Sequence, residues 1–88
     1  MDGLVDVGSA NFVLIARVIA ITDVKLACLQ AQMAEARLKG QLLDLTCGRP
    51  ARSALVTDGN CLILSSLRPK TLAARLEQRM LSQVVLEL

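Results

Sequence analysis

Two arginines in a short, stiff loop are the residues of this chain best suited to contact a partner. The loop covers residues 47–52, where Gly48 allows a tight turn and Pro50 fixes one backbone angle. Arg49 and Arg52 should therefore project from a rigid connection between two strands. Guanidinium groups match phosphate with two parallel hydrogen bonds, and a preorganised pair loses little entropy on binding. The pattern predicts a contact with phosphate groups, as in a nucleic acid.

The sequence leaves open whether these two arginines face a partner or their own domain, where they could form ion pairs with Asp44 or Asp58. The charge distribution favours a partner. Residues 1–44 carry four basic and five acidic residues, whereas residues 45–79 carry six basic and two acidic residues. Positive charge gathered in one part of a domain is the footprint of a polyanionic partner. The excess charge of the second half therefore leaves two interpretations open, a nucleic-acid partner or the chance asymmetry of a small domain.

The residue types needed for catalysis or metal binding are poorly represented. The chain has no histidine, its carboxylates form no motif, and its three cysteines lack CxxC spacing, so we expect no enzyme, metal site or cofactor. The segment 8–11 lacks the further glycines and the lysine of a phosphate-binding loop. We expect Cys28 and Cys61 to behave as small hydrophobic residues. Cys47, close to Arg49, is either an ordinary loop residue or a redox-sensing thiol.

The composition predicts one domain, residues 1–88, that associates with itself. Hydrophobic residues make up 53% of the chain and the mean hydropathy is +0.50, which is high for a small monomer with a polar surface. The longest apolar run, residues 12–21, is half the length that a bilayer requires and contains Arg17. Residues 1–3 lack the basic start of a signal peptide. We therefore expect a cytoplasmic protein without a membrane span or small-molecule substrate.

The loop arginines must be positioned by strands whose limits are marked by turn residues. Strands are expected at residues 4–7, 42–46, 53–57 and 61–64, and the β-branched run 12–21 should hold one bent strand or two short ones. The turn signal Asp58-Gly59-Asn60 predicts that the strands on either side of it pair as a hairpin.

Two helices complete the expected fold. The first should run to Lys39, with Thr22 or Asp23 as N-cap and Gly40 just after its end. Its apolar stripe contains Leu26, Leu29, Met33 and Ala36, and Glu35 can pair with Lys39. The second should begin at Pro69 and place Leu72, Ala73, Leu76 and Met80 on one face. The apolar tail 84–86 should pack on the body or in an oligomer contact. This order predicts a small α+β domain with a mostly antiparallel sheet.

Several strings of the chain resemble, in order and spacing, the RemA family of extracellular matrix regulatory proteins. The longest runs from Leu42 to Arg52, and it is followed by Asp58, Ile63-Leu64-Ser65, Pro69, Thr71 and Arg75-Leu76. The N-terminal part agrees through Gly8 and Asn11, Arg17 with Ile19 and Ile21, and Glu35-Ala36-Arg37 before Gly40. The resemblance extends from Leu4 to Leu76.

The resemblance implies a bacterial, cytoplasmic DNA-binding regulator that forms a closed homo-oligomeric ring and activates transcription of extracellular matrix genes in biofilms. By this resemblance, Arg17, Arg49 and Arg52 match family arginines proposed to contact DNA. The chain departs from the family pattern at four positions, with Pro50 in place of arginine, Ala16 in place of asparagine, Ala10 in place of glycine and Cys47 in place of tyrosine.

Besides a redox-sensing thiol at Cys47, two functions remain open from the sequence. The first is a ring that binds double-stranded DNA through its phosphate backbone; base stacking on single strands is not expected, since Phe12 is the sole aromatic residue. The second is a structural or interaction oligomer of the same fold that has lost DNA binding, which the loss of an arginine at Pro50 supports.

Overall fold

The computed structural model describes the backbone of residues 3–87 and the side chains of residues 3–78. Its elements follow the chain in the order β1 (Leu4–Gly8), β2 (Asn11–Leu14), the 3-10 turn η1 (Ile15–Arg17), β3 (Val18–Asp23), α1 (Ala27–Leu38), β4 (Leu42–Asp44), β5 (Ser53–Thr57), the 3-10 turn η2 (Asp58–Asn60), β6 (Leu62–Ser65) and α2 (Pro69–Glu87). This small α+β domain with two helices confirms the predicted fold class. None of the described helices is long and apolar enough to cross a membrane.

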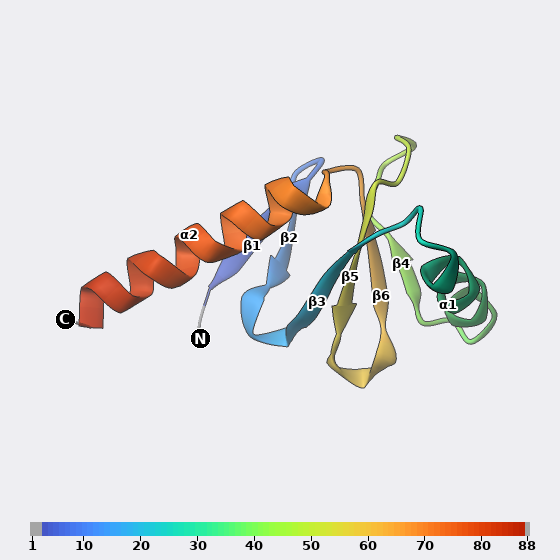
Figure 1. The fold of residues 1–88 in the computed structure, drawn as a ribbon, viewed down its shortest axis with the longest axis horizontal. Helices are drawn as coiled ribbons and strands as arrows, with labels where there is room; N and C mark the ends of the chain where they lie inside the picture. Colours follow the sequence, from blue (N-terminus) through green and yellow to red (C-terminus); the bar gives the residue numbers. More distant parts are fainter. Residues whose placement is uncertain (1–2, 88) are drawn as a thin grey trace.

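The strands form two sheets. Strands β1 and β2 make an antiparallel hairpin, and the other four strands make a sheet in the order β3-β5-β6-β4. Strand β5 is antiparallel to both β3 and β6, which confirms the predicted hairpin around Asp58-Gly59-Asn60. Strand β4 pairs with β6 in parallel, an exception to the otherwise antiparallel layout. The β1–β2 hairpin and the start of α2 lie on one side of the four-stranded sheet, and α1 lies on the other (Figure 1).

Successive side chains of the central strands β5 and β6 point in turn into two apolar cores, one on each face of the sheet. Leu55 and Ile63 point toward the hairpin and α2, where the core is completed by Val5, Val7, Val13, Ile15 and Leu72. Ala54 and Leu64 point the other way, toward Val24 and Leu29 beneath α1. The hairpin layer is also held by polar contacts, because the buried Ser65 hydroxyl donates to the Val7 carbonyl (2.7 Å) and Arg75 of α2 donates to the Asp6 carbonyl (2.9 Å).

The first helix begins later than predicted. Thr22 and Asp23 are not its N-cap, because both belong to β3 and pair with Ala54 and Ser53 of β5. The Asp23 carboxylate accepts a hydrogen bond from the Lys25 backbone N–H (2.9 Å), which turns the chain out of the strand. Leu26 is therefore an exposed residue in extended conformation before the helix, and not part of a buried stripe. Tertiary pairing of β3 has overridden a local capping signal.

The other helix signals agree with the structure. Leu29 and Ala36 are buried and Met33 packs on their cluster. Gly40 adopts a φ of +69°, and the N–H of Gln41 donates to the Ala36 carbonyl (2.8 Å), as in a Schellman motif. Helix α2 begins at Pro69, buries Leu72 and packs Leu76 on the core, while Ala73 is exposed. The side chains of Met80 and of the tail 84–86 lie outside the described residues.

Three further predictions are corrected or made precise. The run 12–21 forms two strands separated by η1. Strand β4 ends at Asp44 and not at residue 46, because the carboxylate of Asp44 accepts hydrogen bonds from Thr46 and turns the chain there. Cys28 and Cys61 are exposed free thiols, not small hydrophobic residues of a core, since Cys28 lies on the solvent side of α1 and Cys61 precedes β6.

Candidate functional site

The arginine loop between β4 and β5 is shaped by its own backbone. The N–H of Arg49 donates to the Thr46 carbonyl (3.1 Å), closing a four-residue turn. Its two central residues, Cys47 and Gly48, have φ values of +53° and +85°, the left-handed pair that defines a type I′ turn. Nothing lies within 4 Å of a Cβ added to Gly48, so the glycine is required for its conformation and not for space.

The first end of the loop is anchored by Asp44. One carboxylate oxygen accepts hydrogen bonds from both the hydroxyl (2.6 Å) and the backbone N–H (2.9 Å) of the buried Thr46. These hydrogen bonds stabilise the ionised form and lower the pKa of Asp44 below its ordinary value. Asp44 therefore holds the loop closed instead of pairing with Arg49 or Arg52, as the alternative from the sequence had it.

The second end is fixed by Arg52, whose backbone bridges the two neighbours of β5. Its N–H donates to the Ser65 carbonyl at the end of β6 (2.9 Å), and its carbonyl accepts from the Val24 N–H after β3 (3.3 Å). The side chains of Arg49 and Arg52 remain exposed. The loop backbone is thus held by hydrogen bonds at both ends, and both arginine side chains project from it into solvent.

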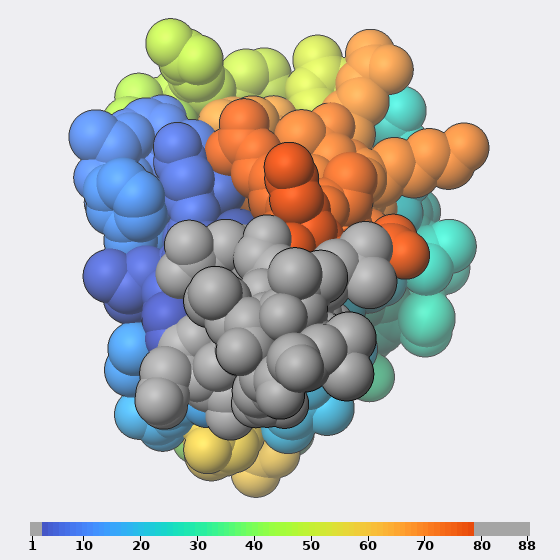
Figure 2. All heavy atoms as spheres, turned by 90° about the vertical axis from the view of Figure 1, so that its left-hand side faces the viewer, coloured from blue at the N-terminus to red at the C-terminus, as the bar shows by residue number. Residues whose placement is uncertain are grey.

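Asn11 connects this loop to the β1–β2 turn. Its side-chain amide donates to the carbonyl of Leu45 (3.2 Å) and, at longer range, to that of Ser9 (3.4 Å), and it lies 3.9 Å from the Cys47 sulfur. The turn and the loop therefore form one end of the molecule, and Figure 2 shows the yellow-green loop segment along the top of the face that also carries the blue turn and the orange start of α2.

Arg49 and Arg52 share this end of the molecule with three further cations, and we call it the basic end. Its five cations are Lys25, Arg49, Arg52, Arg68 and Lys70. All five are exposed, and none forms an ion pair with a carboxylate whose side chain the structure describes. Lys25 follows β3 beside the backbone of Arg52, while Arg68 and Lys70 flank the start of α2. The sequence indicated the excess charge but could not place Lys25, Arg68 and Lys70 beside the loop. Their positions depend on the order of the strands in the sheet, which brings distant segments of the chain to this end.

Arg17 lies at the opposite end of the sheet. Its Nε donates to a carboxylate oxygen of Asp58 (2.7 Å), which raises the pKa of Arg17 further. Because Val18 pairs with Thr57 at the end of β5, the length of β5, about 15 Å for five residues, separates Arg17 from the loop. The structure brings Arg49 and Arg52 together and does not bring Arg17 to them within one subunit.

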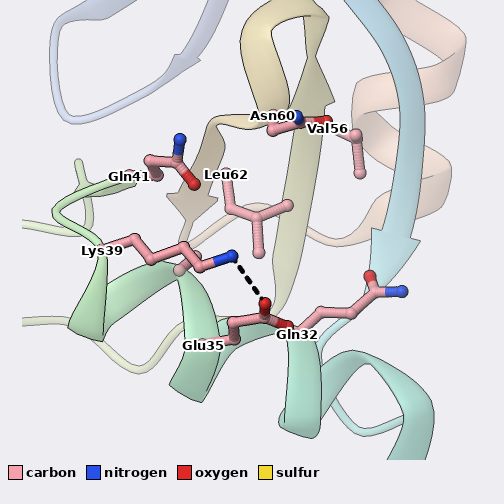
Figure 3. Close-up of a pocket in the computed structure, with 8 residues that line it drawn as sticks. Gln32, Glu35, Lys39, Gln41, Val56, Asn60 and Leu62 are labelled. Carbon is pink, nitrogen blue, oxygen red and sulfur yellow. Dashed lines mark hydrogen bonds and ion pairs between the residues drawn. The ribbon is translucent and has the colours of Figure 1, made fainter.

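A polar pocket beside α1 offers little chemistry. It has a volume of about 460 Å³, and its titratable groups, Glu35 and Lys39, bind each other at 2.8 Å (Figure 3). This confirms the predicted pair, and the hydrogen bond from Lys39 lowers the pKa of Glu35. Within the described residues, no group of three His, Cys, Asp or Glu side chains could hold a metal ion.

A family model for RemA-like proteins, described as extracellular matrix regulatory protein A-like, matches residues 4–76. The chain belongs to the RemA-like family. Three relatives carry the name "Putative regulatory protein". They are 44% identical over 75 residues in Thermotoga petrophila, 42% over 75 in Synechococcus elongatus and 41% over 80 in Fervidobacterium nodosum. The alignments cover 85%, 85% and 91% of this chain and 82%, 86% and 86% of the relatives.

The β1–β2 turn at the basic end holds an alanine in a conformation that favours glycine. Gly8 pairs with Asn11, and the two residues between them, Ser9 and Ala10, have φ values of +55° and +63°. A left-handed conformation costs an L-residue roughly 1–2 kcal/mol, and glycine adopts it freely. Ala10 therefore adds strain to the turn that Asn11 joins to the arginine loop.

We expect Ala10→Gly to stabilise the protein by about 0.5–1 kcal/mol, because relief of the strain exceeds the unfolded-state entropy of about 0.4–1 kcal/mol that glycine adds. Thermal unfolding should show a melting temperature higher by about 4 °C. Ala34→Gly on the exposed side of α1 is the matched control, and it should lower the melting temperature because its helical φ gains nothing from glycine. A fall of similar size in both variants would contradict strain at Ala10.

Proposed function

We propose that this chain is a regulatory protein that binds double-stranded DNA through its phosphate backbone. The observation that carries the proposal is the pair Arg49 and Arg52, exposed, without carboxylate partners among the described side chains, and projected by a loop whose backbone is fixed at both ends. Preorganised guanidinium groups lose little entropy on binding phosphate. Lys25, Arg68 and Lys70 add positive potential around the pair and would favour approach of a polyanion.

The proposed cellular role extends from the family. We infer a cytoplasmic regulator that acts on transcription of extracellular matrix genes in a bacterium, in keeping with the family description and with the names of its relatives. The chain acts as a homo-oligomer, in our proposal a closed ring, so that each copy contributes a basic end. Several weak phosphate contacts on one rigid assembly then act on a single DNA with high effective concentration.

Arg17 takes part in a different way from the loop arginines. Its Nε is engaged by Asp58, and the two terminal amino groups of its guanidinium remain for a phosphate. Since Arg17 lies at the far end of β5, it would contact a phosphate distant from those at the loop, or DNA held by a neighbouring copy. We therefore place Arg49 and Arg52 first among the DNA contacts and Arg17 second.

The proposal is tested by a salt series with a duplex and a single strand of the same sequence in a mobility-shift assay. Two phosphate contacts give a slope of about −1.8 in a plot of log affinity against log salt, and each further engaged copy makes the slope steeper. We expect a slope of at least this size and a preference for the duplex.

Two results would contradict this function. A shift that does not change with salt, or that favours the single strand, would exclude backbone contacts to duplex DNA. A folded oligomer without any shift at low salt would favour the second candidate, an interaction module that has lost DNA binding. The replacement of a family arginine by Pro50 is the observation that supports this candidate.

A further inference from the structure

One edge of the molecule carries an apolar hollow between β3 and α2. Its volume is about 620 Å³, and the small side chains of Ala16, Ala20 and Ala73 contribute to its lining. Strand β3 is the last strand of the sheet on this side, so its outer backbone groups have no strand partner among the described residues. Natural proteins cover or charge such strands, because a long apolar edge otherwise pairs with another chain.

A β-bulge in β3 gives this edge a projecting side chain. Val18 pairs with Thr57 and Ala20 pairs with Val56, so Ile19 is the additional residue in the ladder. Bulges re-aim side chains, and Ile19 is 67% exposed, an unusual position for isoleucine. We call β3, Ile19 and the adjoining hollow the Ile19 edge.

The opposite edge of the molecule carries a second apolar surface. Here β2 and β4 face each other across a groove of about 440 Å³, to which β6 contributes Ile63. Phe12 of β2 and Leu43 of β4 line the groove and are 58% and 52% exposed. Strand β4 is the last strand on this side of the sheet. We call this surface the Leu43 groove.

We propose that the Ile19 edge of one copy packs into the Leu43 groove of the next copy. This inference rests on the self-association included in the proposed function and names the two surfaces that produce it. The occupant is a second copy because the chain itself offers both halves: one apolar surface has a projecting side chain and the other has a groove that can receive it. The contact would also cover both free edges of the four-stranded sheet, since β3 and β4 are its outer strands.

Such a contact is heterologous, because two different surfaces meet. Copies joined in this way add head to tail, and they form a ring when the rotation between neighbours closes. In a symmetric contact, each surface would instead meet the same surface of the other copy, and one such contact joins only two copies. The two modes differ in how variants of one surface behave when they are mixed.

The test uses Ile19→Arg and Leu43→Arg, each of which places a charge on one exposed surface. Light scattering after gel filtration should show that the wild type assembles and that each variant alone is a monomer. An equimolar mixture should form a one-to-one heterodimer and nothing larger, because each variant supplies the intact surface that the other lacks. Phe12→Arg, on the other side of the groove from Leu43, should give the same results as Leu43→Arg in this experiment.

Controls separate this inference from the DNA-binding function. Leu38→Arg, at an 89% exposed position on α1 outside both surfaces, should assemble as the wild type does. Circular dichroism checks that each variant is folded. A monomeric wild type, a variant that dimerises alone, or a mixture that stays monomeric would overturn the proposed contact. A protein that assembles as described but does not bind DNA would contradict the proposed function and leave this contact standing.

Discussion

Replacing Arg49 and Arg52 together with alanine should weaken duplex binding at least about 30-fold at low salt and leave the fold unchanged. Each charge-assisted contact to phosphate contributes about 1 kcal/mol or more, and 1.4 kcal/mol corresponds to a tenfold change in affinity. The salt slope should become shallower by about two for each engaged copy, because fewer counterions are released. Both side chains are exposed and the loop is held by backbone contacts, so unfolding does not explain the loss. A mobility-shift series at several salt concentrations measures both effects.

A double variant on another surface controls for net charge. Arg37→Ala with Lys39→Ala removes two positive charges at the C-terminal end of α1, away from the basic end, and should reduce affinity much less. Equal losses in the two double variants would mean that net charge, and not the loop, attracts DNA. Undiminished binding by the loop variant would reject Arg49 and Arg52 as contacts and direct attention to Lys25, Arg68 and Lys70.

The largest expected effect on stability is that of Leu72→Ala, which should cost about 3 kcal/mol. Leu72 is fully buried where the first turn of α2 meets the hairpin and the central sheet. Removing a buried leucine side chain loses its transfer free energy and leaves a cavity, together about 2–5 kcal/mol. In a domain of this size the melting temperature should fall by about 12 °C or more.

Leu38→Ala is the matched control for this substitution. Leu38 is 89% exposed at the end of α1, so its truncation should change the melting temperature by little. Thermal unfolding followed by circular dichroism compares the two variants directly. Equal effects would show that α2 does not close the core, which would contradict the packing of the hairpin layer.

Local signals predicted those elements whose limits depend on neighbours in the sequence. Gly40 ends α1, Pro69 begins α2, and the Asp58-Gly59-Asn60 turn joins β5 and β6, because each position requires a backbone geometry that these residues favour. The tight turn of the arginine loop at Gly48 was predictable for the same reason. The start of α1 was not, because the pairing of Thr22 and Asp23 with β5 is a long-range contact that competes with a local cap.

The parts of the site that the sequence could not predict depend on the order of the strands in the sheet. That β4 runs parallel to β6 depends on pairing between segments about twenty residues apart. The same order brings Arg68 and Lys70 to the arginine loop and leaves Arg17 at the far end of β5. The distribution of charge along the chain contains no information about this arrangement, because it is set by the sheet.

The position of β6 between β5 and β4 has a consequence for synthesis of the protein. The arginine loop has to pass over the end of β6, a strand that leaves the ribosome after the loop itself, and its Arg52 N–H is held by Ser65 of that strand. A nascent chain that ends before residue 65 lacks this hydrogen bond, so its loop is not held in place even though Arg49 and Arg52 are already present. Because domains generally fold as units during translation, we expect the affinity for DNA to appear in one step, late in the synthesis of the chain.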